Sequence, residues 1–470
     1  MFIIKKKAAA VAVALSVVML TSTLGNASNI SASTSGGNTD YFIVNPYSTV
    51  DWQSFDQYKA DFHSHTTESD GGNTASEMIE DHYAKGFDIL AITDHNVLNT
   101  AWDRTDRPAD KVYLTSERLA EISSGTDREG RGMVAVTNTD EQSQSDHLNT
   151  FWAPFNNESG DTLESKIAKA DTLGGISHIN HLGRYTGARS VSLEEGEKIS
   201  TDPAVVGKYV DLFTKYDSVV GMEIINKKDG DSISDRILWD SILQKTMENR
   251  RPVWGFSNDD THSVAATGFS YNMMLMPENN VDNIRKSMET GTFYAVAKVA
   301  KRELGADFVA QGPTPTIENI SVDQDENDIT IQGDDYNTIQ WVADGQVIAT
   351  GNTIDLNDYE GEINSYIRAQ LIGDGGVSFT QPFGVNEYTL DNLQDSVEKL
   401  DLNHGMSQSL TVKLNHAEKS IDTGKGNYVN LLKAFTNQVN AQSGKKISVD
   451  QANALNKAVS EIILNLTPQY

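Results

Sequence analysis

The chain has 470 residues, of which 38% are hydrophobic and 22% charged, and this composition predicts a globular protein of two to four domains. It contains no cysteine, so disulfides, cysteine nucleophiles and thiolate zinc sites are excluded. The formal net charge is −28, which disfavours nucleic-acid binding because an acidic chain gains little from counterion release. A small anionic substrate is still compatible with this charge, since a metal site carries its own positive field.

The first residues predict an export signal and not a part of the fold. The basic run MFIIKKK precedes the apolar run AAAVAVALSVVML, which is short for a membrane span, and the small residues GNA end at Ala27. We therefore predict a cleaved signal peptide over residues 1–27 and a secreted, extracellular protein, with an uncleaved anchor as the alternative. A flexible lead-in rich in Ser, Gly, Asn and Thr follows over residues 28–40, and no later segment predicts a membrane span.

Residues 41–312 alternate short apolar runs with helical patterns. The apolar runs are YKADFHSH, FDILAITDH, GMVAVTNTD, GGISHINH, SVVGMEIIN, RPVWGFSND and GTFYAVA. Strands that alternate with helices indicate parallel βαβ units and the α/β class. About seven such units favour a closed or distorted β/α barrel, and a doubly wound open sheet is the alternative.

Two smaller domains are predicted after this block. Over residues 313–385, short runs of alternating polarity and a turn at Asp344 and Gly345 indicate a small β-sandwich. Residues 386–470 predict a helical bundle, because apolar residues recur at helical spacing in three of its segments.

Most of the histidines occupy equivalent places in the predicted strands. Seven of the ten lie at or just after carboxyl ends of these strands, which in a parallel β/α barrel meet on the face that carries the active site. The seven are His63, His65, His95, His147, His178, His181 and His262. The other three, which we expect to be structural or surface residues, are His82, His404 and His416.

The stretch DFHSHTTESDG concentrates metal ligands at the end of the first predicted strand. His63 and His65 are two residues apart, so both rings point to one side of a strand, and Asp70 follows on the loop. Later strand ends add ITDHN, TNTDEQSQSDH, ISHINH and NDDTH. Imidazole and carboxylate without thiolate suit zinc, manganese or iron. The motifs supply about nine ligands, too many for one ion, so we predict two or three divalent ions able to activate water and hold phosphoryl oxygens.

Together these motifs resemble a known family. DFHSH, TDH, the NH of INH, and DTH follow in the order of the four motifs of the PHP domain (polymerase and histidinol phosphatase), over about residues 58–297. The resemblance implies a distorted (β/α)7 barrel that holds three metal ions. The ligands it implies are His63, His65, Glu141 and Asp260 for the first ion, Glu141, His147 and His181 for the second, and Asp70, His95 and His262 for the third.

Two of these ligand positions have rivals. His178 competes with His181, because Leu182 stands where the family usually has proline. Asp140 competes with Glu141, because the bridging glutamate of the family usually follows a Gly-x pair and here follows TNTD.

Within the family, the chain is similar to exported metallohydrolases that carry a C-terminal β-domain. The C-terminal helices resemble the FIMAH module of secreted enzymes from Gram-positive bacteria. This second resemblance implies no chemistry, and association with the cell wall or extracellular matrix is one role that we consider for it.

The sequence favours a secreted metal-dependent phosphoesterase that acts on a small phosphate ester. Asp94 is expected to orient a ligand histidine, and Arg184 is a candidate phosphate clamp because arginine forks match phosphate geometry. Lys227 and Lys228 are weaker candidates for the same role, and Glu223 is expected to give structural support.

Two other functions stay open at this point. The same metal site could hydrolyse a carboxyl ester, carbamate or amide, and the aromatic run FWAPF after His147 keeps an apolar substrate pocket in consideration. Alternatively, the chain could be a binding protein in which metals are structural or absent.

Overall fold

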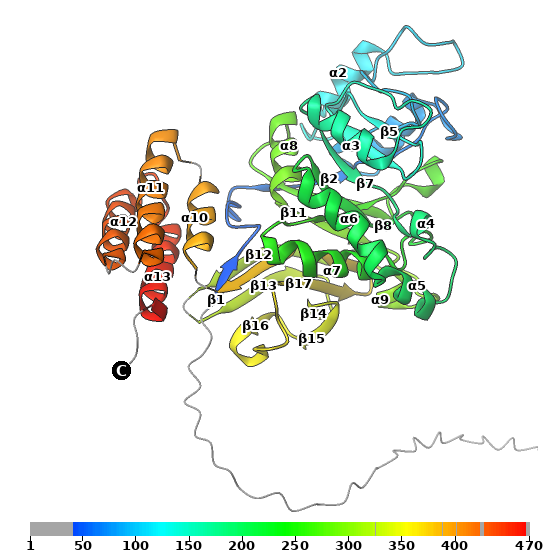
Figure 1. Cartoon of the computed structure of the whole chain (residues 1–470). Helices are drawn as coiled ribbons and strands as arrows, with labels where there is room; N and C mark the ends of the chain where they lie inside the picture. The colour runs from blue at the N-terminus through cyan, green and yellow to red at the C-terminus, as the bar shows by residue number, and fades with distance from the viewer. Residues whose placement is uncertain (1–40, 325, 388, 401, 424–426, 467–470) are drawn as a thin grey trace, which may run out of the picture. The chain divides into compact units, whose positions relative to one another are not determined.

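The computed structural model describes residues 41–324, 326–387, 389–400, 402–423 and 427–466 (Figure 1). The predicted signal peptide and lead-in, residues 1–27 and 28–40, lie outside the described residues. Across the part of the chain that is described, no helix has both the length and the apolar character needed to span a bilayer.

The largest sheet has eleven strands and runs through both the predicted catalytic block and the region that follows it. Its main path is β1 (Tyr41–Val44), β19 (Phe383–Glu387), β17 (Tyr366–Gly373), β18 (Gly376–Phe379), β11 (Phe293–Ala297), β10 (Ser270–Met276), β2 (Asp56–Asp61), β3 (Ile89–Ala91) and β4 (Val134–Val136). Off this path, β14 (Thr338–Ala343) pairs with β17, and β15 (Gln346–Thr350) pairs with β14.

Two smaller sheets complete the strands. The five-stranded sheet has the order β5 (Asp140–Gln142), β6 (Leu148–Phe151), β7 (Ile176–Ile179), β8 (Val219–Asn226) and β9 (Trp254–Asn258). Its last three strands are parallel, whereas β5 and β6 form an antiparallel hairpin. The three-stranded sheet is β12 (Thr316–Asp323), β13 (Asp328–Asp334) and β16 (Thr353–Asp355).

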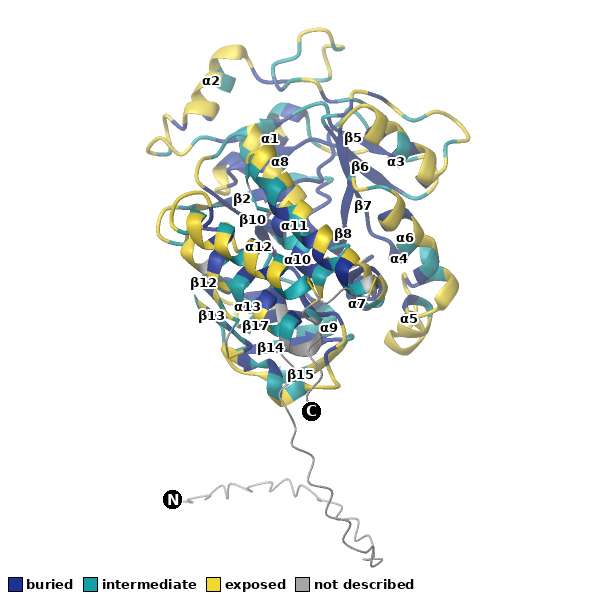
Figure 2. Cartoon of the chain, turned by 60° about the vertical axis from the view of Figure 1, so that its left-hand side comes forward, coloured by how far each residue is buried: buried dark blue, intermediate teal, exposed yellow. Residues whose placement is uncertain are grey.

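Helices connect and cover the strands of the predicted catalytic block. They are α1 (Ala75–Ala84), α2 (Ser116–Ser124), α3 (Leu163–Thr172), α4 (Gly183–Thr186), α5 (Leu193–Ser200), α6 (Pro203–Lys215), α7 (Asp235–Thr246), α8 (Val281–Thr290) and α9 (Lys301–Leu304). Their starts follow local rules: α1 begins at a capping box of Thr74 and Glu77, and α6 begins at the cap Asp202 with Pro203 in its first turn. Figure 2 shows exposed residues on α3 and α5 and buried residues along β5, β6 and β7.

All seven predicted strands are present, as β2, β3, β4, β7, β8, β9 and β11. The predicted barrel, however, is not closed: among the described residues no ladder joins β4 to β5 or β9 to β10, so two sheets replace one. The sequence missed the β5–β6 hairpin and β10, which pairs antiparallel with both β2 and β11. These antiparallel strands interrupt the parallel βαβ order that a closed barrel requires.

The two sheets nevertheless enclose one apolar core below the strand ends. Phe62, which follows β2, meets Phe151 of β6 and Phe256 of β9 edge-to-face, with ring centroids 5.9 and 6.2 Å apart. All three rings are fully buried. Because this core has contributions from both sheets, it fixes the distance between their carboxyl ends.

The strands of residues 313–385 form two layers, but not a separate sandwich. Ile320 and Ile331 of the three-stranded sheet share an apolar cluster with Trp341 of β14. The second layer continues the large sheet, because β18 pairs with β11 through the register Ala295 to Phe379. The predicted domain boundary between residues 312 and 313 therefore divides one hydrogen-bonded sheet.

The C-terminal helices have a core of their own. They are α10 (Leu390–Glu398), α11 (His404–Asp422), α12 (Tyr428–Gln442) and α13 (Val449–Leu466). Leu393, Leu414, Phe435 and Leu455 each bring one helix into a single buried cluster. His404 and His416 are exposed on α11, as expected.

A buried tyrosine connects β11 to the chain between β18 and β19, and its removal should be costly. The Tyr47 hydroxyl donates to the Phe293 carbonyl at 3.0 Å and accepts from the Gln381 amide at 2.8 Å, with the side chain 1% exposed. We expect Tyr47→Phe to lower the free energy of unfolding by about 1–3 kcal/mol, because two backbone groups lose a buried partner. Urea denaturation checks this value, with Tyr58→Phe as a control whose hydroxyl, among the described residues, donates to the Asp56 side chain alone. Equal stability of the two variants would contradict it.

Candidate metal centre

The end of β2 delivers two histidine rings to one side, as their spacing predicts. His63 and His65 are fully buried, and their ring centroids lie 5.0 Å apart. His63 Nε2 lies 3.2 Å from Glu141 Oε1, and His65 Nε2 lies 3.2 Å from Asp260 Oδ1. The strand therefore directs both rings to carboxylates that come from other strand ends.

A buried aspartate holds this strand end in place. Asp61 Oδ1 accepts from the His63 amide at 3.1 Å, and Asp61 Oδ2 lies 3.1 Å from His82 Nε2. The other ring nitrogen of His82 lies 2.8 Å from the Met78 carbonyl within α1. His82 is thus a structural residue of the core, as expected.

The carboxylate of Glu141 lies at the centre of the cluster. Its Oε1 is 2.9 Å from His147 Nδ1, 3.2 Å from His63 Nε2 and 3.5 Å from His181 Nε2. The amide of Asn180 also donates to this oxygen at 2.7 Å. Burial opposes ionisation of Glu141, yet the nearby imidazoles, His63 foremost, hold its pKa well below the usual range. A buried carboxylate that stays ionised needs positive charge around it.

The second oxygen of Glu141 faces the large sheet. Its Oε2 lies 2.5 Å from His95 Nδ1 and 3.6 Å from His65 Nε2. A backbone bridge also pairs His95 with Glu141, so the ends of β3 and β5 meet here. Glu141 therefore contacts histidines from both sheets.

Asp260 is the second buried carboxylate of the cluster. Its Oδ1 lies 3.2 Å from both His65 Nε2 and His262 Nδ1, and 3.6 Å from His63 Nε2. Asp260 has a φ of +44° and His181 a φ of +29°, in the left-handed region that non-glycine residues rarely adopt. Strain of this kind persists only where the surrounding structure enforces it, and it is common at functional sites.

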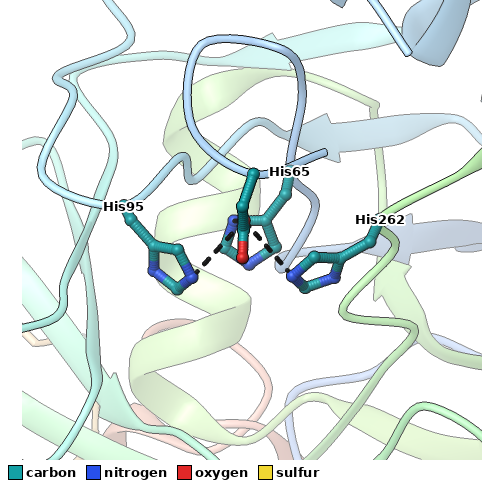
Figure 3. A group of neighbouring side chains, drawn as sticks. His65, His95 and His262 are labelled. Atoms are coloured by element: carbon teal, nitrogen blue, oxygen red, sulfur yellow. Dashed lines mark ion pairs between the residues drawn. The ribbon is translucent and has the colours of Figure 1, made fainter. Parts of the chain in front are cut away.

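A third group of ligands lies nearer to the solvent. Asp70 Oδ1 is 3.4 Å from His262 Nε2, 3.6 Å from His95 Nε2 and 3.9 Å from His65 Nδ1. Figure 3 shows the rings of His65, His95 and His262 converging on one space. The Asp70 side chain is 57% exposed, so this group forms the open side of the cluster.

The nitrogen and oxygen atoms of the cluster are better placed to coordinate divalent cations than to form hydrogen bonds with one another. Several buried atoms lie within ion-pair distance of one another yet form no hydrogen bond among the described residues: His63 Nε2, His65 Nε2, His95 Nδ1, Glu141 Oε2 and Asp260 Oδ1. Such orphaned polar atoms are costly in a protein interior unless something else binds them. The nitrogen and oxygen atoms form groups of three or four within 4.8 Å of one another, a set that suits zinc, manganese or iron.

At the two ligand positions with alternatives, one residue of each pair lies in the cluster and the other lies outside it. His178 stacks on Phe256 at 4.7 Å in the apolar core, where burial lowers its pKa to about 4, and it joins none of the ligand groups found in the described residues. Asp140 is buried outside those groups, and burial raises its pKa to about 9. His181 and Glu141 lie in the cluster instead.

Asp94 acts on a loop and not on a ligand ring, which revises its expected role. Its carboxylate accepts from the Thr66 amide and hydroxyl, both at 2.7 Å, and from the Ser69 hydroxyl at 2.6 Å. The loop that it holds carries Asp70. Gly71 completes the turn, because a Cβ there would come within 2.6 Å of the His65 carbonyl oxygen.

Orientation of a ligand ring comes instead from Glu223, for which the sequence predicted only structural support. Glu223 Oε1 lies 2.7 Å from His63 Nδ1, and its Oε2 accepts from the His181 amide at 2.9 Å. Asn226 and Asn258 also donate to this carboxylate, each at 2.9 Å. The available signal was an acid inside the apolar run SVVGMEIIN, because a buried acid needs partners.

Two other residues, Lys227 and Tyr185, border the cluster. Lys227 Nζ lies 3.2 Å from Asp260 Oδ2. The Tyr185 ring, which the sequence analysis missed, packs on His147 and His181 with centroids 5.3 and 5.8 Å apart. Arg184 is exposed, and no side-chain hydrogen bond or ion pair is recorded for it within the described ranges.

The aromatic run FWAPF packs into apolar clusters of the fold. Phe151 belongs to the core between the two sheets, and Phe155 packs in a small buried cluster with Ala153 and Ala170. Trp152 packs against the same core as Phe151. The observation that favoured an apolar substrate therefore has a structural explanation.

Comparison with known proteins identifies the last part of the chain. Residues 389–464 match the model of the FIMAH domain family. This segment is a FIMAH domain. It contains α10 to α13, so the resemblance noted in these helices is confirmed.

The chain is also similar to one curated relative and to several solved structures. It is 33% identical over 78 residues to a 5'-3' exoribonuclease of Haemophilus influenzae, a match of 17% of this chain that spans only 27% of that relative. A two-domain protein of Bacteroides vulgatus with a PHP-like metal-dependent phosphoesterase shares 14% identity over 72% of this chain and 88% of its own, with a TM-score of 0.37. The lesion-specific endonuclease PfuEndoQ of Pyrococcus furiosus shares 15% identity over 50% and 56%, with a TM-score of 0.29. At these scores, function has to be argued from the site itself.

The contact between Glu223 and His63 generates a prediction about metal affinity. Glu223→Gln removes the carboxylate that lies against His63 Nδ1, so this ring loses its fixed orientation. We expect metal affinity to fall by about 10–100-fold, as is typical when the outer partner of a ligand histidine is lost. Competition titration with a metal chelator measures this change. Glu289→Gln, an exposed change on α8, is the control, and equal affinities of the two variants would contradict the prediction.

Proposed function

We propose that this protein is a secreted metal-dependent phosphoesterase that hydrolyses a small phosphate ester. The observation that carries the proposal is the cluster of three carboxylates and six histidines, in which several buried facing atoms lack hydrogen-bond partners within the described residues. Export rests on the leader predicted over residues 1–27. The large negative charge of the chain favours a small substrate over a polyanion.

We assign three divalent ions to the cluster. The residues that would hold them are His63, His65, Glu141 and Asp260 for the first, Glu141, His147 and His181 for the second, and Asp70, His95 and His262 for the third. When bound, such ions lower the pKa of water and stabilise charge on phosphoryl oxygens. Glu141 could contribute to the first two sites, because its Oε1 faces His147 and its Oε2 faces His65.

Two cations of the chain are candidates to bind the phosphoryl group. Lys227 is 38% exposed and pairs only through Asp260 within the described residues, so its ammonium can reach a substrate oxygen beside the cluster. Arg184 follows His181 by three residues and is exposed, so it could bind a more distant oxygen. A cationic contact at this place supports a phosphate ester over an uncharged carboxyl ester.

The proposed reaction can be tested on three small esters. The purified protein, loaded with manganese or zinc, is offered nitrophenyl phosphate, bis-nitrophenyl phosphate and nitrophenyl acetate, with Asp260→Asn as control. We expect hydrolysis of a phosphate ester, and a fall in the variant that exceeds the roughly 10–100-fold effect of an outer-shell change, because a ligand is removed directly. A short RNA is included because of the likeness to an exoribonuclease.

Each outcome of this assay decides between functions. Variant-sensitive hydrolysis of the acetate alone would replace the proposal with a carboxyl-ester hydrolase. Variant-sensitive cleavage of the RNA alone would overturn the choice of a small substrate. No turnover of any ester with metal bound would favour a binding protein.

Lys227 should matter more than the lysine beside it. We expect Lys227→Met to lower kcat on the phosphate ester by about 10²–10³-fold, the usual effect of losing one preorganised group that stabilises developing charge. Lys228→Met is the matched control, because that ammonium lies over the Phe269 ring at 3.9 Å and away from the ligands. Steady-state kinetics on both variants check this, and equal kcat values would remove Lys227 from the site.

A further inference from the structure

A buried lysine organises the loop that separates two of the proposed ligands. Lys166 of α3 is 0% exposed, which is rare for lysine. Its ammonium donates to the Gln142 carbonyl at 2.7 Å, to the Asp146 carbonyl at 2.5 Å and to the Gln144 carbonyl. An ammonium has three donors, so three carbonyls satisfy it completely.

The three carbonyls belong to one short loop segment, residues 142–146, which begins at the last residue of β5 and leads to β6. Glu141 precedes this loop and His147 follows it, with His147 Nδ1 2.9 Å from Glu141 Oε1. Alternate carbonyls of the loop turn inward to one positive charge, in the manner of a loop that wraps a cation. Ser145 in its centre has a φ of +61°, a conformation that needs support from its surroundings.

The contacts of Lys166 account for the placement of both ligands. Without the ammonium, the three carbonyls would lose the donor that they share, and the buried Gln142 carbonyl would be the most costly of them to leave unpaired. Burial lowers the pKa of Lys166 to about 8, so the side chain is still mostly charged at neutral pH. Other contacts hold the outer side of the loop, since Asn96 bonds to Ser143 and Lys208 pairs with Asp146.

We propose that Lys166 is a positioning residue that shapes the loop of residues 142–146 and thereby sets the approach of Glu141 and His147 to their shared divalent ion. It touches neither substrate nor ion. The inference rests on the metal site of the proposed function, although it does not depend on which ester is hydrolysed.

The test compares two lysines of the same helix. Lys166→Met keeps the length of the side chain and removes the charge, whereas Lys169→Met changes an exposed lysine that lies over the Phe155 ring at 5.0 Å. We expect Lys166→Met to bind at least one ion about 10–100-fold more weakly, as after the loss of other groups that orient ligands. Lys169→Met should stay within about twofold of the original chain, like most surface changes. Chelator competition with manganese and zinc, and metal content after dialysis, give these values.

Adding excess metal distinguishes a loss of ligand positioning from a general loss of structure. If Lys166 only shapes the ligand geometry, excess manganese should restore metal content and kcat in Lys166→Met. His147→Ala, which removes a ligand outright, should not recover at the same concentration. Unchanged metal affinity in Lys166→Met, with the fold intact by circular dichroism, would overturn the proposal.

Amide exchange keeps the proposal testable if Lys166→Met does not fold. In the metal-free original chain, the ammonium should already order the loop, so the amides of Ser143 and Gln144 should be protected. Free exchange of these amides until metal is added would contradict the role of Lys166. Because this readout and metal affinity need no turnover, failure of the phosphoesterase proposal with metal still bound would remain distinguishable.

Discussion

The whole site depends on one buried carboxylate. Glu141 is fully buried, its pKa lies well below the usual range, and the rings around it come from both sheets. A lone ionised carboxylate in such a place is unfavourable by several kcal/mol, so the fold must bring positive charge to it. The convergence of strand ends from two separate sheets meets this requirement, and cations between Glu141 and Asp260 would complete it.

A second set of polar groups, around the cluster, holds the cluster residues and their loops in place. Glu223 holds His63 and the backbone of His181, and Asp94 holds the loop that carries Asp70. Lys166, an ammonium where the other two are carboxylates, holds the loop between Glu141 and His147. Within the described residues each of these three groups is satisfied, whereas several atoms of the cluster, such as His65 Nε2 and Asp260 Oδ1, form no hydrogen bond. That asymmetry indicates binding and not merely a polar core.

Sequence reasoning identified the residues that cluster here because strand periodicity and strand ends are local properties. His63 and His65 converge since they are two apart on a strand, and Asp260 and His262 follow a strand end in the same way. The role of Glu223 was missed because its partner is 160 residues away in the chain. Lys166 left no signal at all, since its partners are backbone carbonyls, which every residue type carries. Barrel closure failed as a prediction because the pattern of apolar runs shows strands but not their direction.

Solvent exposure increases from the inner to the outer side of the cluster. This difference constrains the direction from which a substrate could approach. His63 and Glu141 are inaccessible, whereas Asp70, His262 and His95 retain exposed surface. Lys227 is exposed beside Asp260, on the edge that His262 also borders. A substrate of the proposed kind would therefore meet the outer residues of the cluster and this ammonium first. The inner ligands are then shielded from solvent, where low dielectric strengthens every charge interaction with the reacting group.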